Sequence, residues 1–200
     1  MRPRKHVVGV VGPLLATTAT GQFPAESVGS TGVKRSNRES RIMKPRIEYQ
    51  KIAPAAFQAM RAFETYIRGC GLEPTLLELI KIRASQINGC AYCLDMHTKD
   101  ARAQGETEQR IYALNAWRET PFFTEKERAA LAWTEAVTLV AQSQVPDEVY
   151  ELARKYFNEK ELVNVTGAII AINGWNRFAV SFRSVPGTYQ PPQQQAKVSP

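Results

Sequence analysis

The stretch from Glu78 to His97 reads ELIKIRASQINGCAYCLDMH and holds two of the three cysteines of the chain. It also holds the only histidine outside the N-terminal segment. Cys93 follows Cys90 by three positions and His97 follows Cys93 by four, and residues three and four apart share one face of a helix. We therefore predict a helix that begins near Cys90 and aligns both thiols with the imidazole. Glu78 is expected on the preceding helix, packed alongside.

These residue types are suited to thiol redox chemistry. A thiolate is the attacking species, and its formation near neutral pH requires a lowered pKa. A helix N-terminus supplies about half a positive charge, and a neighbouring imidazole can accept the proton. Glu78 is expected to orient His97, as the third group does in nucleophile–base–carboxylate arrangements. The spacing of Cys90 and Cys93 also allows their sulfurs to close into a disulfide after one of them is oxidised.

Other interpretations of a Cys-x-x-Cys pair stay open at this point. A structural zinc ion needs four ligands, and the sequence offers no second cysteine pair and no second histidine beyond the N-terminal segment. A thioredoxin fold needs strands, which the sequence does not offer. The two cysteines can also be small buried hydrophobes, with a histidine nearby by coincidence. We interpret Cys70, alone at the end of an earlier helix, in this last way.

Length and charge limit the possible classes of protein. The 200 residues are enough for one domain with a sizeable core plus appendages. The net charge is +7, but residues 1–45 hold eight basic and two acidic residues, which leaves 18 basic and 17 acidic residues for 46–200. The folded part is therefore nearly neutral, and we expect no nucleic-acid binding from it. The number of cysteines is odd, and two of the three are only three positions apart. This pattern is typical of a cytoplasmic protein, whose compartment is reducing. No apolar run approaches the ~20 residues of a membrane span.

Hydrophobic spacing predicts helices throughout the middle of the chain. Apolar residues recur at three- and four-residue intervals from Ala55 onward, and no stretch shows the period-two alternation of a strand. Thr124 and Asn158 are each followed three positions later by glutamate, the pattern of a capping box. Gly167 and Gly174 in the last helix indicate a close approach to another helix. We expect an all-α fold of about seven helices, with approximate ranges 55–68, 74–87, 90–104, 107–119, 125–143, 147–157 and 162–183.

The two ends of the chain differ from this helical part in composition. Residues 1–45 are rich in Gly, Ser, Thr, Pro and Arg and are expected to form a basic, disordered extension. Their start is basic and is followed by a short apolar run, as in a secretory signal peptide. Glycines and a proline interrupt this run, however, and no small-x-small cleavage site follows it. Residues 186–200 are Pro/Gln-rich and are also expected to be disordered. The folded domain is therefore expected to span residues 46–185.

The spacing Glu-x11-Cys-x2-Cys-x3-His, formed by Glu78, Cys90, Cys93 and His97, resembles the signature of the alkylhydroperoxidase AhpD-like family within the carboxymuconolactone decarboxylase superfamily. The surrounding sequence is similar too, notably ELIKIRASQINGCAYCLDMHTKDAR, FTEKERAALAWTEAVT and INGWNRFAV. The resemblance covers about residues 46–185, and it implies an AhpD-like helical bundle.

The resemblance also implies a peroxide-reducing or disulfide-reducing activity that needs no cofactor or metal. The reductant it implies is a cellular dithiol, such as a lipoyl-bearing protein. In the family the second cysteine attacks and the first resolves, which assigns Cys93 as the peroxidatic thiol and Cys90 as the resolving thiol. His97 is then the base and Glu78 the far end of a proton relay. Helix-end electrostatics alone would favour Cys90 as the attacker, but His97 is one turn from Cys93 and two from Cys90.

One position departs from the family pattern. The best-known members have a histidine just before the second cysteine, whereas this chain has Tyr92, a weaker acid, which lowers the expected peroxidase efficiency. Family members are usually trimers or hexamers, and the glycine-bearing last helix is a candidate interface. Two alternative functions are retained. One is a carboxymuconolactone decarboxylase-like reaction without thiol redox, and the other is a non-enzymatic helical oligomer that senses redox state through its disulfide.

Overall fold

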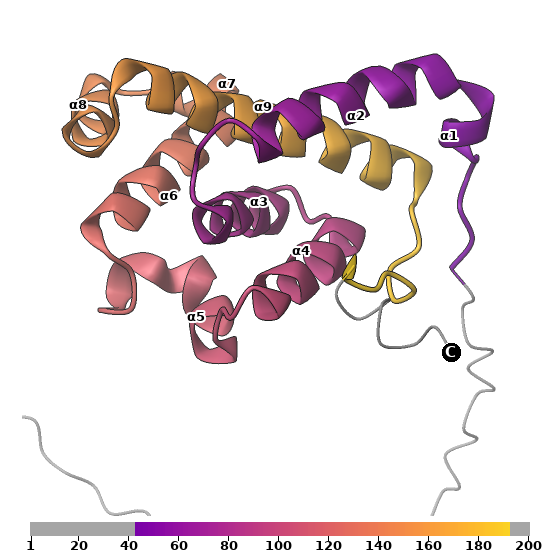
Figure 1. Ribbon diagram of the computed structural model, residues 1–200, viewed down its shortest axis with the longest axis horizontal. Helices are drawn as coiled ribbons and strands as arrows, with labels where there is room; N and C mark the ends of the chain where they lie inside the picture. The colour runs from indigo at the N-terminus through magenta and orange to yellow at the C-terminus, as the bar shows by residue number, and fades with distance from the viewer. Residues whose placement is uncertain (1–42, 193–200) are drawn as a thin grey trace, which may run out of the picture. The chain divides into compact units, whose positions relative to one another are not determined.

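Helix α3 (Pro74–Ile87) lies at the centre of the fold, with other helices packed around it (Figure 1). The computed structural model describes residues 43–192. Pro74 stands in the first turn of α3, where its missing N–H removes no helical hydrogen bond. Nine of the 14 residues of α3 are buried, among them the charged residues Glu78 and Lys81. A helix enclosed in this way carries polar groups into the interior of the domain.

The described residues are mainly helical and contain no strand, so the expected all-α fold is confirmed. Between residues 43 and 192, no helix has both the length and the apolar character that crossing a membrane requires. Besides α3, the elements in chain order are α1 (Tyr49–Ile52), α2 (Pro54–Arg68), α4 (Ala91–Ala103), α5 (Glu108–Ala113), the 3-10 helix η1 (Leu114–Glu119), α6 (Glu125–Thr138), α7 (Val140–Ser143), α8 (Asp147–Tyr156) and α9 (Glu159–Phe182).

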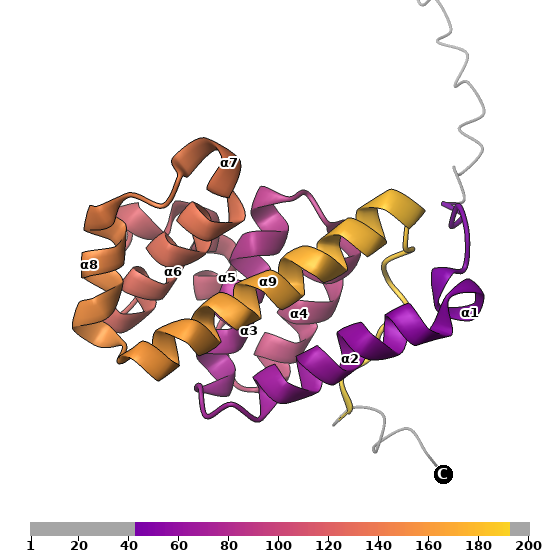
Figure 2. The same cartoon turned by 90° about the horizontal axis from the view of Figure 1, so that it is seen from above.

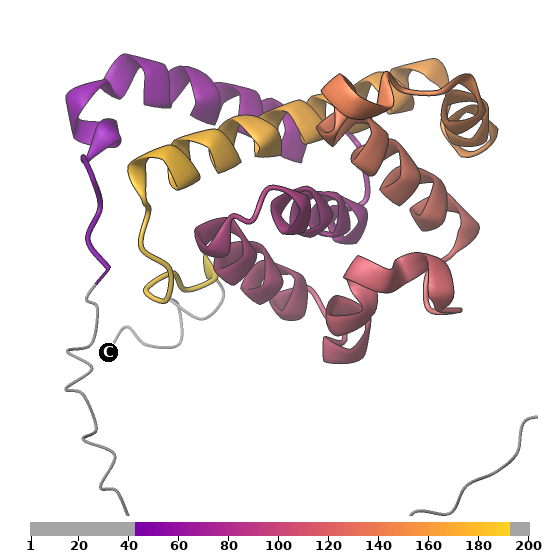
Figure 3. The same cartoon turned by 180° about the vertical axis from the view of Figure 1, so that it is seen from behind.

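Three groups of helices surround α3. Helices α2 and α9 pack against each other, and the view from above shows α9 crossing over α3 (Figure 2). Helix α4 packs against α3 from the other side (Figures 1 and 3). Helices α6 and α8 pack together, and α6 also contacts α3. Side chains from α3, α4 and α9 therefore meet inside the domain.

Two glycines allow α9 to approach α2 closely. A Cβ atom added at Gly167 would lie 2.9 Å from Ile67 Cδ1, and one at Gly174 would lie 2.7 Å from Met60 Cε. Both distances are shorter than real Cβ contacts, so only glycine fits without a shift of the neighbour. The expected close helix approach is confirmed, and the neighbouring helix belongs to the same chain.

Reciprocal capping boxes start two long helices where the sequence predicted them. The backbone N–H of Glu127 donates to the Thr124 hydroxyl, and the backbone N–H of Thr124 donates to the Glu127 carboxylate. Asn158 and Glu161 make the same pair of bonds at the start of α9. Each box satisfies backbone donors that have no partner within the helix.

Two of the expected helices are divided in the structure. The range 107–119 splits into α5 and η1, with non-helical angles at Ala116 (φ −114°, ψ 28°). The range 125–143 splits into α6 and α7 at Leu139 (φ −97°, ψ 32°). Neither break contains glycine or proline, and the hydrophobic spacing continues across both. The sequence therefore predicts one continuous helix in each range. With the short α1, the described residues form nine α-helices instead of about seven.

The C-terminal segment differs from the expected disorder as far as residue 192. The N–H of Gly187 donates to Asp95 Oδ2 at 2.9 Å, and the Tyr189 hydroxyl donates to Asp100 Oδ1 at 2.7 Å. Both acceptors lie on α4, so this segment is fastened to the helix that carries the cysteines. Individual polar contacts hold it, and composition gives no sign of them. The expected N-terminal extension up to residue 42 and residues 193–200 lie outside the described part of the chain.

Candidate redox site

The turn between α3 and α4 positions the two cysteines. Gly89 has φ +63°, the left-handed region that favours glycine, and the N–H of Cys90 donates to the Ser85 carbonyl at 3.0 Å. Helix α4 therefore folds back along α3, with Cys90 as its N-cap. Cys93 and His97 both fall on the buried face of α4 because they are four positions apart.

The thiols of Cys90 and Cys93 are in direct contact. Their Sγ atoms lie 2.7 Å apart, and both cysteines are free. Each residue is only 1% exposed. The N–H of Cys93 also donates to Cys90 Sγ at 3.4 Å. A disulfide holds its sulfurs about 2.05 Å apart, so a short movement closes the pair.

This contact makes the first thiol proton easy to remove and the second one difficult. The hydrogen bond from Cys93 lowers the pKa of Cys90 to about 7, although burial opposes it. The same bond raises the pKa of Cys93, with burial and the charge of Cys90 acting in the same direction. Asn176 favours the charged form of both thiols through its side-chain hydrogen bonds. At most one of the two thiols is therefore ionised near neutral pH, and that one is Cys90.

Glu78 and His97 form a buried hydrogen-bonded pair. His97 Nδ1 and Glu78 Oε2 lie 2.8 Å apart, and the two residues are 2% and 3% exposed. Burial raises the pKa of Glu78, but the hydrogen bond and charge of His97 and the charge of Lys81 outweigh burial and hold that pKa below its ordinary value. Across residues 43–192, His97 donates to no thiol and accepts from none. A proton that moves between His97 and a thiol therefore needs a bridging molecule.

A cavity of about 470 Å³ opens onto Cys93 and His97, whereas Cys90 does not border it. Its other walls are mostly aromatic or apolar: Tyr49, Phe57, Tyr92, Met96, Trp175, Ala179 and Tyr189. The rest of the lining is polar or charged: Gln50, Arg61, Glu64, Thr65 and Arg68. A small organic molecule that enters this cavity reaches Cys93 before Cys90.

Lys81 is a buried cation beside this site, although no sequence pattern indicates it. Its side chain is 1% exposed, and its Nζ lies 2.7 Å from Glu64 Oε1 and 3.7 Å from Glu78 Oε1. In the sequence it resembles any lysine on the solvent face of an amphipathic helix. Only the enclosure of α3 by its neighbours buries it. The ammonium offsets two carboxylates and so allows Glu78 to be charged inside the domain.

Asp100 and Tyr189 also lie at the site, although neither was predicted from the sequence. The Tyr189 hydroxyl donates to Asp100 Oδ1, and Lys99 Nζ donates to the Tyr189 carbonyl at 3.0 Å. Asp100 follows His97 by three positions and Cys93 by seven, so helical spacing was the signal that could have found it. Tyr189 had no comparable signal, because it lies in a segment with no periodicity.

Asn176 contributes a polar group to the same site from α9. It is 1% exposed, and its Nδ2 donates to Ser85 Oγ at 3.1 Å. Its Oδ1 accepts a hydrogen bond from Asn88 Nδ2 at 2.8 Å. Helix α9 holds three asparagines, Asn164, Asn173 and Asn176, and nothing in the sequence singles out the one that faces the thiols. Asn176 therefore links the thiol pair to both α3 and α9.

Glu78, His97 and Asp100 are grouped closely enough to be considered as metal ligands. One ligand atom of each lies within 4.8 Å of the others. The ammonium of Lys81, however, is 3.7 Å from Glu78 Oε1 and opposes a second cation there. The arrangement suits proton transfer better than metal binding.

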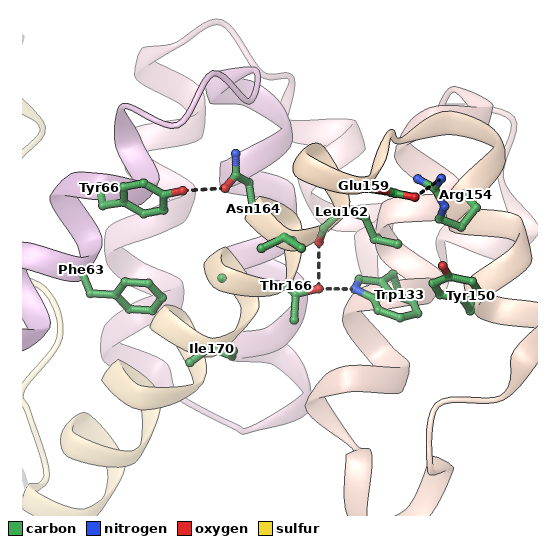
Figure 4. Close-up of a pocket in the computed structure, with 12 residues that line it drawn as sticks. Phe63, Tyr66, Trp133, Tyr150, Arg154, Glu159, Leu162, Asn164, Thr166 and Ile170 are labelled. Carbon is green, nitrogen blue, oxygen red and sulfur yellow. Dashed lines mark hydrogen bonds and ion pairs between the residues drawn. The ribbon is translucent and has the colours of Figure 1, made fainter.

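A second cavity, of about 540 Å³, lies between α2, α6, α8 and α9 (Figure 4). In it the Tyr66 hydroxyl donates to Asn164 Oδ1, and the Trp133 indole N–H donates to Thr166 Oγ1, both at 2.9 Å. Neither cysteine nor histidine lines this cavity. A molecule bound in it would therefore meet neither a thiol nor an imidazole.

Comparison with known proteins gives the chain clear relatives. The Carboxymuconolactone decarboxylase family profile matches residues 54–136, a range that contains Glu78, Cys90, Cys93 and His97. The uncharacterized protein YdfG of Bacillus subtilis (strain 168) is 46% identical over 139 residues, which cover 70% of this chain and 95% of YdfG.

Solved structures also resemble this chain. One from Agrobacterium tumefaciens, described as a protein of unknown function and a candidate antioxidant defence protein AhpD, is 49% identical with a TM-score of 0.71. That match covers 73% of this chain and all of the other. The debrominase Bmp8 shares the fold at 20% identity, with a TM-score of 0.63 over 70% of this chain and 75% of Bmp8. The chain belongs to the AhpD-like group of the carboxymuconolactone decarboxylase superfamily.

Proposed function

We propose that the protein is a thiol-dependent peroxidase that reduces organic hydroperoxides through Cys93, Cys90, His97 and Glu78. Family membership supports an antioxidant or related role. The observation that carries the proposal is the pair of free thiols 2.7 Å apart, next to a cavity that also reaches a buried imidazole–carboxylate pair. No metal or organic cofactor takes part in the proposed cycle.

In the first step the Cys93 thiolate attacks the terminal oxygen of the hydroperoxide. An S–O bond forms and the O–O bond breaks, so sulfur loses two electrons and becomes a sulfenic acid. The leaving alkoxide takes a proton from His97, directly or through solvent, and departs as an alcohol. Glu78 holds the Nδ1 side of the ring and stabilises its protonated form.

In the second step the Cys90 thiolate attacks the sulfur of the Cys93 sulfenic acid. An S–S bond forms and the S–OH bond breaks, and the hydroxide leaves as water with the proton that Cys90 gave up. An external dithiol, such as a lipoyl-bearing protein, then reduces the disulfide by thiol–disulfide exchange and is itself oxidised to a disulfide. The resting dithiol is restored.

Access supports Cys93 as the attacking thiol, although Cys90 has the lower pKa. Only Cys93 borders the cavity. The thiolate on Cys90 can accept the Cys93 proton across the 2.7 Å contact, which places the negative charge on the accessible sulfur. Cys90 is then a thiol with a low pKa, ready to become the resolving thiolate. The hydrogen bond between the thiols therefore serves both steps.

The cavity walls suit a substrate with an apolar or aromatic body. The rings of Phe57 and Trp175 pack edge-to-face with their centroids 5.5 Å apart, and both residues border the cavity. Tyr92 replaces the histidine of the best-known family members, and burial raises its pKa, so its hydroxyl stays protonated near neutral pH. It can donate a hydrogen bond to a bound oxygen but releases no proton readily. We therefore expect a modest rate of turnover.

Single substitutions of the cysteines test the proposal. With cumene hydroperoxide and dihydrolipoamide as substrates, Cys93→Ser is expected to abolish turnover. Cys90→Ser is expected to stop after one turnover, with Cys93 held as a sulfenic acid. Cys70→Ser is the matched control and retains turnover, because Cys70 borders neither the pair nor the cavity. Full turnover in Cys93→Ser would refute the proposal.

The family profile also supports a decarboxylase-like reaction as the second candidate. Such a reaction would use the same cavity without thiol oxidation, so Cys90→Ser would leave it unaffected. Carbon dioxide release from a carboxylated lactone measures it directly. The non-enzymatic alternative is distinguished by subunit number, because a redox-sensing oligomer would change its assembly on oxidation without turning over.

A further inference from the structure

Tyr189 reaches the redox site from outside the segment that the family profile matches. Its ring borders the cavity of Cys93 and His97, and its hydroxyl donates to Asp100 Oδ1 at 2.7 Å. Two further hydrogen bonds hold it in place: the Gly187 N–H donates to Asp95 Oδ2, and Lys99 Nζ donates to the Tyr189 carbonyl. All three contacts are made with α4, so the C-terminal segment is fastened to the helix that carries the thiols.

Asp100 is the residue through which Tyr189 can act on the chemistry. Asp100 is 7% exposed, and its Oδ2 is buried without a hydrogen-bond partner among the described residues. One oxygen of Asp100 lies within 4.8 Å of ligand atoms of both Glu78 and His97. The imidazole therefore has two carboxylates close to it, one bonded at Nδ1 and one nearby on its own helix.

We propose that Tyr189 and Asp100 are positioning residues. The Tyr189 hydroxyl holds Asp100 in place, and Asp100 acts as a second carboxylate beside the Glu78–His97 pair. An ionised Asp100 stabilises the protonated imidazole, which is the form that gives a proton to the leaving alkoxide. The link to turnover rests on the proposed peroxidase function. The effect of Tyr189 on the ionisation of Asp100 does not depend on it.

The direction of the effect follows from the groups that face Asp100. They are Glu78 on α3, His97 on α4, Arg68 on α2 and Tyr189 in the C-terminal segment. Burial raises the pKa of Asp100, the Tyr189 hydrogen bond lowers it, Glu78 raises it, and His97 and Arg68 lower it, with a net rise above the ordinary value. Removal of the hydroxyl therefore raises the pKa further and makes Asp100 neutral over a wider acidic range.

Proton NMR of the histidine ring tests this on the full reduced chain, which contains only two histidines. In the wild type, the pH curve of the His97 signal is expected to show an acidic inflection from Asp100. In Tyr189→Phe this inflection is expected to move up by about half a pH unit or more. Tyr112→Phe is the matched control, because its exposed hydroxyl also donates to a carboxylate, that of Glu108, away from the cavity. Its curve is expected to match the wild type.

A second variant tests whether Tyr189 acts through Asp100. Asp100→Asn is expected to abolish the acidic inflection, and Tyr189→Phe is expected to add nothing in that background. In the peroxidase assay, Tyr189→Phe is expected to lower kcat about threefold at acidic pH, with KM little changed. A rise of about half a unit in the pKa of Asp100 lowers its ratio of ionised to neutral form by this factor. Superimposable His97 curves for wild type and Tyr189→Phe overturn the proposal even if turnover is normal. A shifted inflection without turnover in the wild type supports it and refutes the peroxidase function instead.

Discussion

At the scale of single residues, the thiol pair predicts a particular pH dependence of reactivity. The hydrogen bond from Cys93 lowers the pKa of Cys90 to about 7, whereas an unperturbed thiol has a pKa of about 8.5. A lowered pKa leaves more thiolate at neutral pH, so alkylation is expected to rise with pH through a midpoint near 7. Iodoacetamide labelling in a Cys70→Ser background isolates the pair. A midpoint at or above that of the same protein in urea would contradict this account.

Buried Lys81 predicts a large effect on stability. Replacement by methionine leaves Glu64 and Glu78 without the ammonium that lies 2.7 and 3.7 Å from them. Removal of one partner from a buried ion pair costs about 3 kcal/mol or more in the free energy of unfolding. Lys51→Met is the control, because Lys51 forms an exposed ion pair with Glu48, and such pairs contribute about 0–1 kcal/mol. Equal urea midpoints for the two variants would show that Lys81 does not carry this role.

Part of the candidate site, but not all of it, could be predicted from the sequence. Glu78, Cys90, Cys93 and His97 meet as their spacing predicted, because helical periodicity and one tight turn are enough to align them. Their catalytic roles stay predictions. Lys81, Asp100, Tyr189 and Asn176 were not predicted. Helical spacing from His97 offered a signal for Asp100, whereas the burial of Lys81 and the approach of Asn176 and Tyr189 depend on packing between elements distant in the sequence.

At the scale of elements, the contact between α2 and α9 predicts opposite effects for two similar substitutions. Alanine raises helix propensity over glycine by about 1 kcal/mol at either position. At Gly174 the added Cβ meets the flexible end of Met60, which can move, so Gly174→Ala is expected to be neutral or stabilising. At Gly167 it meets Ile67, which is fully buried, and overpacking of about 1–3 kcal/mol outweighs the propensity gain. Thermal unfolding of both variants measures the difference, and a stabilised Gly167→Ala would contradict it.

The element boundaries show what sequence patterns can and cannot reveal. Helix starts were predictable at Thr124 and Asn158 because capping boxes are local signals. The breaks at Ala116 and Leu139 were not predictable, since neither has a glycine or proline and the apolar spacing continues through them. The bonds of Gly187 and Tyr189 to α4 depend on tertiary structure alone.

At the scale of the whole molecule, we propose that the chain forms a homo-oligomer through the outer face of α9. Val163 and Ile170 are 68% and 56% exposed, lie seven positions apart on one helical face, and border the second cavity. Gly167 lies between them on the same face and packs against α2, so Val163 and Ile170 are apolar side chains that remain exposed beside that contact. Sedimentation equilibrium is expected to give a multiple of 22.4 kDa, and Ile170→Asp is expected to reduce it. Val180→Asp, also exposed on α9 but outside that cavity, is the control. A wild-type monomer would contradict the proposal.

The central claim is that Cys90 and Cys93 form a peroxide-driven dithiol pair, and a thiol count by intact mass tests it most directly. The reduced protein is treated with one equivalent of an organic hydroperoxide and then alkylated. We predict the loss of two labelling sites, mapped to Cys90 and Cys93, while Cys70 is still labelled. If all three cysteines stay open to alkylation, the peroxidase account is contradicted.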